Sequence, residues 1–245
     1  MRDTLSEIVK LTSNLFDFLY VDGTDTKTEV RAMSEDKSLI LKCTPKAPLV
    51  DLRGEVAISD LGMLSGLLGF ASYNTDTATF SVQRNKRGEV EYAEMMEFKD
   101  GRKAGAVFRL TNPATIREDR LPPSLRDVPW EISITPEKSR VTEFGQLAGL
   151  YSKVDTLFTP KTQDGNLVFM VGEENSSMHS ATMVFHEDVG ATLKGTARYP
   201  IASFQALMKI AGTNAATLGL TSRGVMGVTV DTQHAIYNYI LRASK

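Results

Sequence analysis

The two halves of this chain present the same order of predicted elements, although they share hardly any identical residues. In each half an amphipathic helix comes first, and strands, a short helix and three more strands follow it. A repeated order of this kind indicates a structural duplication. Two helices packed against antiparallel sheet, twice over, is an α+β design, so we expect two tandem α+β domains.

Hydrophobic periodicity and turn residues set the limits of these elements. In the first half, helices are predicted over residues 4–18 and 60–70, and Ser59 is the expected cap of the second helix. The strands of that half are predicted over residues 28–33, 37–44, 52–58, 77–83, 89–98 and 106–111, with a hairpin turn over 85–88. In the second half, helices are predicted over 137–153 and 202–211, and strands over 130–135, 156–160, 167–172, 179–185, 195–200, 216–221, 225–231 and 235–242.

A segment rich in proline and charge separates the two halves. Residues 112–129 contain four prolines and several charged side chains. This composition is typical of a linker between domains. We therefore expect an N-terminal domain over residues 1–112, a connector over 113–129 and a C-terminal domain over 130–245.

The charge of the chain limits how it can bind nucleic acid. The net charge is −2, whereas a surface that grips phosphates densely makes a protein basic. Any DNA contact must therefore be local or loose. The single cysteine, Cys43, excludes an intramolecular disulfide and a zinc site of several thiolates. With no signal peptide and no apolar run of membrane length, we expect a cytoplasmic protein without a membrane partner.

The sequence shows no recognisable active site. Phosphate-binding glycine loops, dinucleotide-binding fingerprints and nucleophile elbows are all missing from it. His179 and His186 bracket one predicted strand at an odd spacing, so their side chains point to opposite faces and cannot easily share a metal. These absences favour a binding or scaffold protein over an enzyme, and we expect no cofactor and no metal.

Three segments carry a resemblance to a known family. Residues 56–70 (VAISDLGMLSGLLGF) form a predicted strand and a small-residue helix that the pair Asp60-Leu61 opens. Residues 139–171 form a helix and a hairpin, and residues 198–243 a short helix and three strands. In this order the segments resemble the DNA polymerase sliding clamps of T-even-like bacteriophages. The last one is also similar to the closing segment of proliferating cell nuclear antigen.

The resemblance implies a ring. In this family, two-domain subunits assemble head to tail as a homotrimer by pairing edge strands. Helices line the hole and antiparallel sheets form the outer wall. The ring encircles double-stranded DNA without reading its sequence, and a clamp loader places it there. It has no activity of its own and acts as a processivity factor, because it tethers the replicative DNA polymerase and other clients.

The outward rows of the predicted helices suit an inner surface that slides on DNA. Such a surface needs sparse positive charge among short polar side chains, and lysine supplies charge without a fixed geometry. A lone lysine on a helix is also a common solubilising residue, which is the alternative at each position. The predicted DNA-facing residues are Lys10, Arg140, Lys153 and Lys209.

Clients of the family dock in an apolar groove beside the connector. The predicted walls are Leu121, Leu125 and Val128 of the connector, with Tyr239 and Leu241 of the final strand. Packing in the domain core is the alternative for each of them. Trp130 belongs either to this groove or to the core of the second domain.

Two other functions remain open at this point. A β-rich structural protein of a phage virion would share the composition and the missing active site, but it would not need positive residues on the helix faces. An enzyme of unrecognised type would need a pocket with perturbed ionisable groups, and the sequence identifies none.

Overall fold

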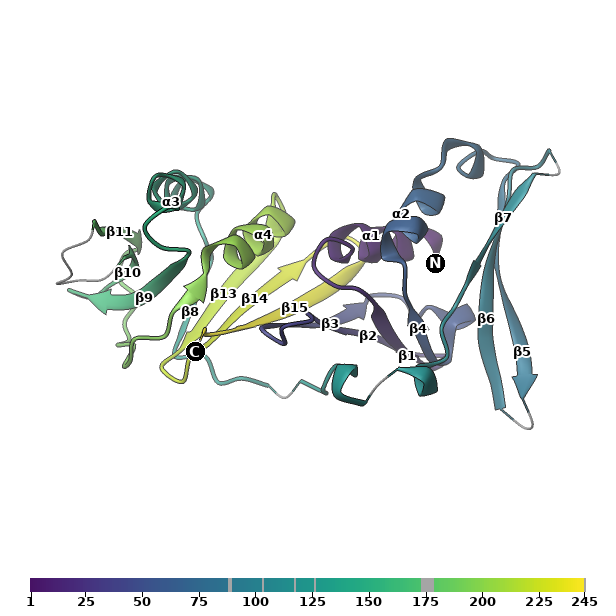
Figure 1. Cartoon of the computed structure of the whole chain (residues 1–245), viewed down its shortest axis with the longest axis horizontal. Helices are drawn as coiled ribbons and strands as arrows, with labels where there is room; N and C mark the ends of the chain where they lie inside the picture. Colours follow the sequence, from purple (N-terminus) through teal and green to yellow (C-terminus); the bar gives the residue numbers. More distant parts are fainter. Residues whose placement is uncertain (88–89, 103, 117, 126, 173–178, 245) are drawn as a thin grey trace. The chain divides into compact units, whose positions relative to one another are not determined.

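The computed structural model describes residues 1–87, 90–102, 104–116, 118–125, 127–172 and 179–244. The chain forms two compact units of mixed helix and antiparallel sheet (Figure 1). Unit 1 comprises Met1–Leu125 with Gln233–Ile236, and unit 2 comprises Arg126–Thr232 with Tyr237–Lys245. The predicted connector contributes residues to both units, and the predicted domain limits stay a prediction.

Unit 1 begins with two helices and a run of antiparallel strands in the order β4-β1-β2-β3. Helix α1 turns Leu5, Ile8 and Val9 inward, each at most 1% exposed. Strand β2 alternates buried and half-buried residues, as a sheet covered on one face requires. The elements are α1 (Arg2–Thr12), β1 (Leu19–Gly23), β2 (Thr28–Met33), β3 (Leu39–Pro45), η1 (Val50–Leu52), β4 (Gly54–Ile58), α2 (Leu61–Gly69) and η2 (Ala71–Tyr73).

A second sheet of unit 1 consists of β5 (Thr79–Arg87), β6 (Val90–Lys99) and β7 (Gly105–Arg109), paired antiparallel in chain order. The register of β5 and β6 shifts between Gln83 and Arg84. Beyond β7, Thr111 forms an isolated bridge with Ala57 of β4, which connects this segment to the first sheet. Two short 3₁₀ helices, η3 (Pro113–Thr115) and η4 (Glu118–Arg120), follow.

Unit 2 repeats this plan with different strand pairings. One set of its strands has the order β15-β14-β13-β8, and the other has the order β11-β10-β9-β12. Trp130 packs directly on the backbone of β13 and β14, where added Cβ atoms at Gly219 and Gly227 would lie 2.3 and 2.4 Å from the indole. The elements are β8 (Ile132–Ile134), α3 (Lys138–Tyr151), β9 (Leu157–Gln163), β10 (Asn166–Val171), β11 (Ala181–His186), β12 (Tyr199–Pro200), α4 (Ile201–Ala211), β13 (Ala215–Thr221), β14 (Val225–Asp231) and β15 (Ala235–Arg242).

The first helix is shorter than predicted. It ends at Thr12, whose hydroxyl donates to the carbonyl of Ile8 at 2.6 Å. Thr12, Ser13 and Asn14 are residues whose side chains compete for backbone hydrogen bonds, which favours an exit from the helix. The apolar residues that follow form β1, a strand missing from the prediction.

Two local predictions were wrong. Ser59 does not cap α2, because the cap position is Asp60 in a left-handed conformation (φ 50°), and the Ser59 hydroxyl pairs with that of Thr111 at 2.9 Å. The hairpin turn predicted over residues 85–88 begins too early, since β5 continues to Arg87. The last residue of that turn lies outside the described residues.

Candidate functional site

The predicted DNA-facing lysines are exposed on or beside the helices. Lys10 lies in the last turn of α1, Lys209 in the last turn of α4, and Lys153 just beyond the end of α3. None of the three forms an ion pair within the part of the chain that the structure describes. Their charges are therefore available to an external anion. Lys10 and Lys209 also complement the carbonyl ends of their own helices, an effect of about 0.3–1 kcal/mol.

Arg140 differs from these lysines, because carboxylates within unit 2 already neutralise it. The Arg140 guanidinium lies 3.0 Å from Glu143 on its own helix and 3.7 Å from Glu187. Its side chain is about one-third exposed. A phosphate would have to compete with these two carboxylates, so Arg140 is the weakest of the predicted DNA-facing residues.

Helix α2 presents a neutral surface. No residue of Leu61–Gly69 carries charge, and Met63 on its outer side is 61% exposed. Cβ atoms added at Gly62, Gly66 and Gly69 would meet nothing within 4 Å. This helix offers a phosphate backbone no positive side chain, and its polar side chain is the half-buried Ser65.

Lys138 is a candidate that the sequence reading missed. It is exposed at the first position of α3, where it lines a cavity of about 510 Å³ together with Val141, Met208 and Lys209. The signal was available, since Lys138 lies in the helix predicted over residues 137–153. Lys138 and Lys209 thus bring two ammonium groups to one crevice of unit 2.

The residues predicted for the client groove lie in both units, and two of them are fully buried. Tyr239 and Leu241 are each 0% exposed in β15, as the core alternative requires. Leu121 and Leu125 are half-buried in unit 1, and Val128 is half-buried in unit 2. Trp130 belongs to unit 2, packed against its sheet. The client groove stays a prediction.

The first part of the connector is held on unit 1 by polar contacts. The Asn112 side chain accepts from the amide of Ala114 at 3.0 Å and caps η3. Arg120 lies 3.4 Å from both Asp17 and Glu35. Arg31 donates to the carbonyl of Pro122 at 3.3 Å. These contacts fix the path of the chain as far as Pro122.

A cavity of about 710 Å³ lies beneath this part of the connector, within unit 1. Its lining combines carboxylates, two tyrosines and apolar side chains from β4, β6 and the connector. The Tyr20 hydroxyl lies near the Glu55 carboxylate, and the Arg31 guanidinium lies 4.7 Å from the centre of the Tyr20 ring. Burial, together with the Glu55 carboxylate, raises the pKa of Tyr20 to about 12, so the phenol stays protonated.

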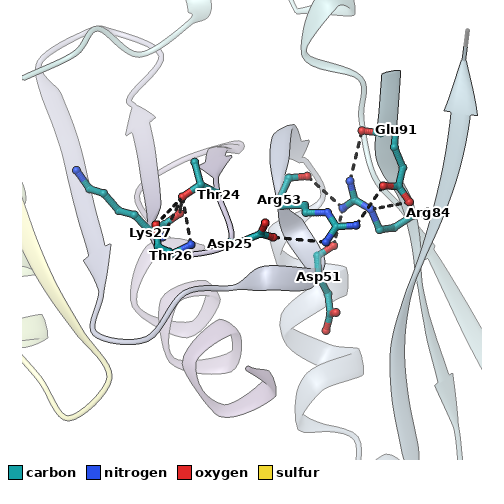
Figure 2. A network of polar contacts seen from close by, with 8 residues as sticks. All are labelled: Thr24, Asp25, Thr26, Lys27, Asp51, Arg53, Arg84 and Glu91. Atoms are coloured by element: carbon teal, nitrogen blue, oxygen red, sulfur yellow. Dashed lines mark hydrogen bonds and ion pairs between the residues drawn. The ribbon is translucent and has the colours of Figure 1, made fainter. Parts of the chain in front are cut away.

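Glu91, which lines this cavity, belongs to a network of arginines and carboxylates (Figure 2). Arg84 of β5 donates to the carbonyls of Asp51 and Arg53 at 3.0 and 3.1 Å, and its Nε lies 3.4 Å from Glu91. Arg53 lies 3.2 Å from Glu91 and 3.4 Å from Asp25. A hydrogen bond from Arg53 and the charges of both arginines hold the pKa of Glu91 below its usual value.

The described residues contain no group of three or more histidine, cysteine or carboxylate side chains that could hold a metal ion. His186 is half-buried in β11, while His179 precedes that strand and is exposed. Among the described helices, none is long and apolar enough to cross a membrane.

No family model matches the chain, and no curated protein matches it either. Solved structures do match. A structure of the C-terminal region of FEN-1 bound to A. fulgidus PCNA aligns with a TM-score of 0.69 and 13% identity, over 100% of this chain and 96% of that chain. PCNA from Thermococcus kodakaraensis aligns with a TM-score of 0.67 and 11% identity, over 100% of this chain and 97% of that chain.

Proliferating Cellular Nuclear Antigen from Entamoeba histolytica gives a TM-score of 0.66 and 12% identity, over 100% of this chain and 96% of that chain. Identities this low establish the fold alone. The predicted α+β clamp architecture is confirmed, and the bacteriophage type stays a prediction. Over its whole length, this chain has the PCNA-like sliding-clamp fold.

Proposed function

We propose that this chain is a sliding clamp, which encircles duplex DNA as a ring and tethers the replicative DNA polymerase and other clients. The observation that supports this function best is the fold likeness to PCNA, which covers 100% of the chain. A clamp has no reaction to catalyse, so its residues have only to hold the ring together, tolerate DNA and bind clients. Its effect on synthesis comes from keeping the polymerase at high effective concentration near the primer end.

Ring assembly has candidate edges in both units. Strand β7 is at the end of the sheet β5-β6-β7 in unit 1, and β11 is at the end of the set β11-β10-β9-β12 in unit 2. Val107 of β7 is 53% exposed. Because the two edges lie on different units, pairing one with the other joins copies head to tail, and a closing rotation gives the homotrimer.

The helix faces support loose contact with DNA. Lys10, Lys153, Lys209 and the additional Lys138 are exposed, whereas α2 contributes no charge. Few lysines per copy attract phosphates without fixing the register of the ring on the duplex. A net charge of −2 is compatible with this arrangement, since a closed ring is retained by topology.

The first test is the solution mass and the effect on a polymerase. We expect a particle near three times 26.9 kDa and, with a clamp loader, a large increase in the length of DNA made per binding event. A monomer at all concentrations, or a large shell, would count against the clamp. A shell would favour the alternative, a β-rich virion protein, which no feature of the structure favours at present.

The second measurement addresses the inner surface. Lys10→Glu combined with Lys153→Glu should shorten retention on circular DNA by roughly tenfold, because it replaces attraction to phosphate with repulsion. The matched control is Lys86→Glu combined with Lys194→Glu, which makes the same charge change at exposed lysines outside the helices. Both double variants should keep the trimer. Equal retention of the two would show that the helix faces do not contact DNA.

A further inference from the structure

A cavity of unit 2 lies where α3, α4 and the start of β13 meet. It has a volume of about 510 Å³, within the range of about 300–1,000 Å³ that small-molecule sites occupy. It is separate from the cavity beneath the connector, since no residue lines both. The lining residues from α3 are Lys138, Val141 and Thr142, and those from α4 are Gln205, Met208, Lys209 and Ala211.

The charged groups of this cavity are all cations. Lys138 and Lys209 are exposed and line it from different helices. Within the part of the chain that the structure describes, neither ammonium group forms an ion pair and no carboxylate lines the cavity. Glu137, the residue before Lys138, accepts from the Ser139 hydroxyl at 3.5 Å and lies outside the lining. The cavity therefore has positive charge that nothing within it compensates.

Helix stability does not explain this pair of lysines. Lys138 is the first residue of α3, where a positive charge opposes the helix dipole. Two ammonium groups beside one cavity also repel each other. An anion between Lys138 and Lys209 compensates both unfavourable interactions, so the charges of the cavity favour an anionic occupant.

The floor of the cavity is apolar. Met208 and Ala211 are each 6% exposed, and Val141 is half-buried. An occupant that covers this floor gains free energy because apolar surface leaves water. The anion must therefore carry an apolar or aromatic part as well as its charge.

Two side-chain amides complete the lining. Gln205 is half-buried and Asn214 is exposed, and among the described residues neither side chain forms a hydrogen bond. The Gln205 amide nitrogen lies 3.7 Å from the position of a Cβ atom added at Gly145, so Gln205 reaches from α4 across to α3. Each amide offers two donors and an acceptor, which matches the donors and acceptors on the edge of a nucleobase.

Other anions satisfy fewer of these groups. Inorganic phosphate leaves the floor uncovered, and an anion with an alkyl chain covers the floor but leaves the amides unpaired. The bases of duplex DNA are paired and stacked, so a base of the duplex enters such a cavity only after it leaves the stack. A free nucleotide supplies phosphate, a flat ring and a polar ring edge in one small molecule.

We propose that this cavity binds a free nucleotide. The base lies on Met208 and Val141, its edge bonds to Gln205 or Asn214, and the phosphates lie between the two lysines. The inference goes beyond the proposed clamp function and does not depend on it, because every lining residue belongs to unit 2. Since the proposed ring assigns the same lysines to DNA, a bound nucleotide and the duplex compete for them.

The experiment is equilibrium dialysis of the full chain against four nucleoside diphosphates, those of adenosine, guanosine, cytidine and uridine. The tightest of the four is the reference ligand. Its nucleoside, pyrophosphate and decyl phosphate are measured in parallel, and they lack the phosphates, the nucleoside and the base respectively. We expect the reference ligand to bind about tenfold more tightly than each of these three.

Variants of the two lysines test the phosphate contacts. Lys138→Gln and Lys209→Gln should each weaken binding of the reference ligand about tenfold, because each removes one cation from the cavity. The matched control is Lys194→Gln, since Lys194 is an exposed lysine of unit 2 that does not line this cavity. It should leave binding unchanged.

A second pair of variants tests the space for the base. Ala215→Trp fills the cavity at an exposed lining position and should lower the affinity of the reference ligand to that of pyrophosphate. Ala202→Trp adds the same side chain at an exposed position of α4 outside the lining and should have no effect. Both alanines are exposed, so neither replacement disturbs the core of unit 2.

The outcomes separate this inference from the proposed function. The site is refuted if no nucleoside diphosphate binds, if pyrophosphate or decyl phosphate binds as tightly as the reference ligand, or if Lys209→Gln and Lys194→Gln behave alike. Trimer formation and polymerase stimulation are measured on the same wild-type preparations. A ring that stimulates the polymerase and binds no nucleotide refutes the nucleotide site alone. Nucleotide binding by a protein that never forms a ring refutes the clamp alone.

Discussion

Units 1 and 2 share an order of elements, yet different chemistry holds them together. The interior of unit 2 contains a cluster of aromatic rings with centroid separations of 4.0–6.0 Å. Phe169 and Phe185 stack, and Phe204 of α4 meets its neighbours mostly edge to face. The members of this cluster are Phe144, Phe158, Phe169, Phe185 and Phe204, all 0% exposed.

Unit 1 combines aliphatic packing, a shorter row of rings (Phe70, Tyr73, Phe80 and Phe98) and arginines that reach across the chain. Arg84 and Arg53 link β5 and the start of β4 to β6 through Glu91 (Figure 2). Arg2 of α1 donates to the carbonyls of Leu68 in α2 and Tyr73 in η2. Aromatic clusters gain stability from buried area, whereas arginine networks gain it from geometry and charge. The same order of elements thus accommodates different packing and different surface contacts in the two units.

The largest expected effect of this difference is on Phe204. Phe204→Ala removes a ring that touches four others and leaves a cavity in unit 2, so we expect the free energy of unfolding to fall by about 3–5 kcal/mol. Urea unfolding gives the magnitude. Hydrogen exchange should show the loss of protection concentrated in α4, β9 and β10.

Phe70→Ala in unit 1 is the matched control, because Phe70 is 53% exposed. It should cost less than about 1 kcal/mol. If Phe204→Ala lowered protection in both units equally, the two interiors would form one cooperative structure and the contrast between them would have no energetic meaning.

A smaller effect is expected at Arg84. Its side chain is 15% exposed and contacts three backbone carbonyls, those of Asp51, Arg53 and Glu91, as well as the Glu91 carboxylate. Arg84→Ala should lower the free energy of unfolding by about 1–3 kcal/mol, measured in urea. Arg84→Lys should recover less than half of the loss, because an ammonium cannot reproduce the planar fork.

Lys86→Ala, at an exposed position two residues along β5, provides the control and should leave the unfolding midpoint unchanged. Full recovery by Arg84→Lys would mean that charge alone stabilises this end of unit 1. Unit 1 would then differ from unit 2 more than the structure suggests, because charge would act in unit 1 where the packing of rings acts in unit 2.

The sequence predicted most of the elements because each leaves a local periodic pattern. Strand β1 was missed because Leu19, Tyr20 and Val21 continue an apolar run that a helix explains equally well. The arginine contacts were not predictable, since Arg31 and the Pro122 carbonyl are 91 positions apart and no local pattern pairs them.

The site was predicted less well than the fold. Exposure of Lys10, Lys153 and Lys209 followed from helix faces, but the ion pair of Arg140 with Glu187 depends on tertiary structure. Tyr239 could have been recognised as buried from the sequence, since every second residue from Ala235 to Leu241 is apolar and faces the core. The cavity beneath the connector needs the meeting of β4, β6 and the connector, which only the folded chain brings together.

The smallest expected effect is the loss of stability at low pH that follows from protonation of Glu91. The folded-state pKa of Glu91 is depressed below its ordinary value of 4.5, first by the hydrogen bond from Arg53. The stabilisation that ionised Glu91 gives to the folded state is therefore complete above about pH 4.5, and it is lost as the pH falls through the folded-state pKa of Glu91. Urea midpoints of wild type and Glu91→Gln, measured from pH 7 to pH 3, should converge at the acid end.

Glu131 of unit 2 sharpens the comparison, because its pKa is also lowered, but by hydrogen bonds from the hydroxyl and amide of the neutral Ser222. Salt screens an exposed pair of charges and hardly affects a bond to a neutral donor. The difference between wild type and Glu91→Gln at pH 7 should therefore shrink in high salt, while that for Glu131→Gln should persist. If the effects of Glu91→Gln and Glu131→Gln depended equally on salt, hydrogen-bond geometry rather than charge would hold Glu91. The surface carboxylates of the two units would then be stabilised in the same way.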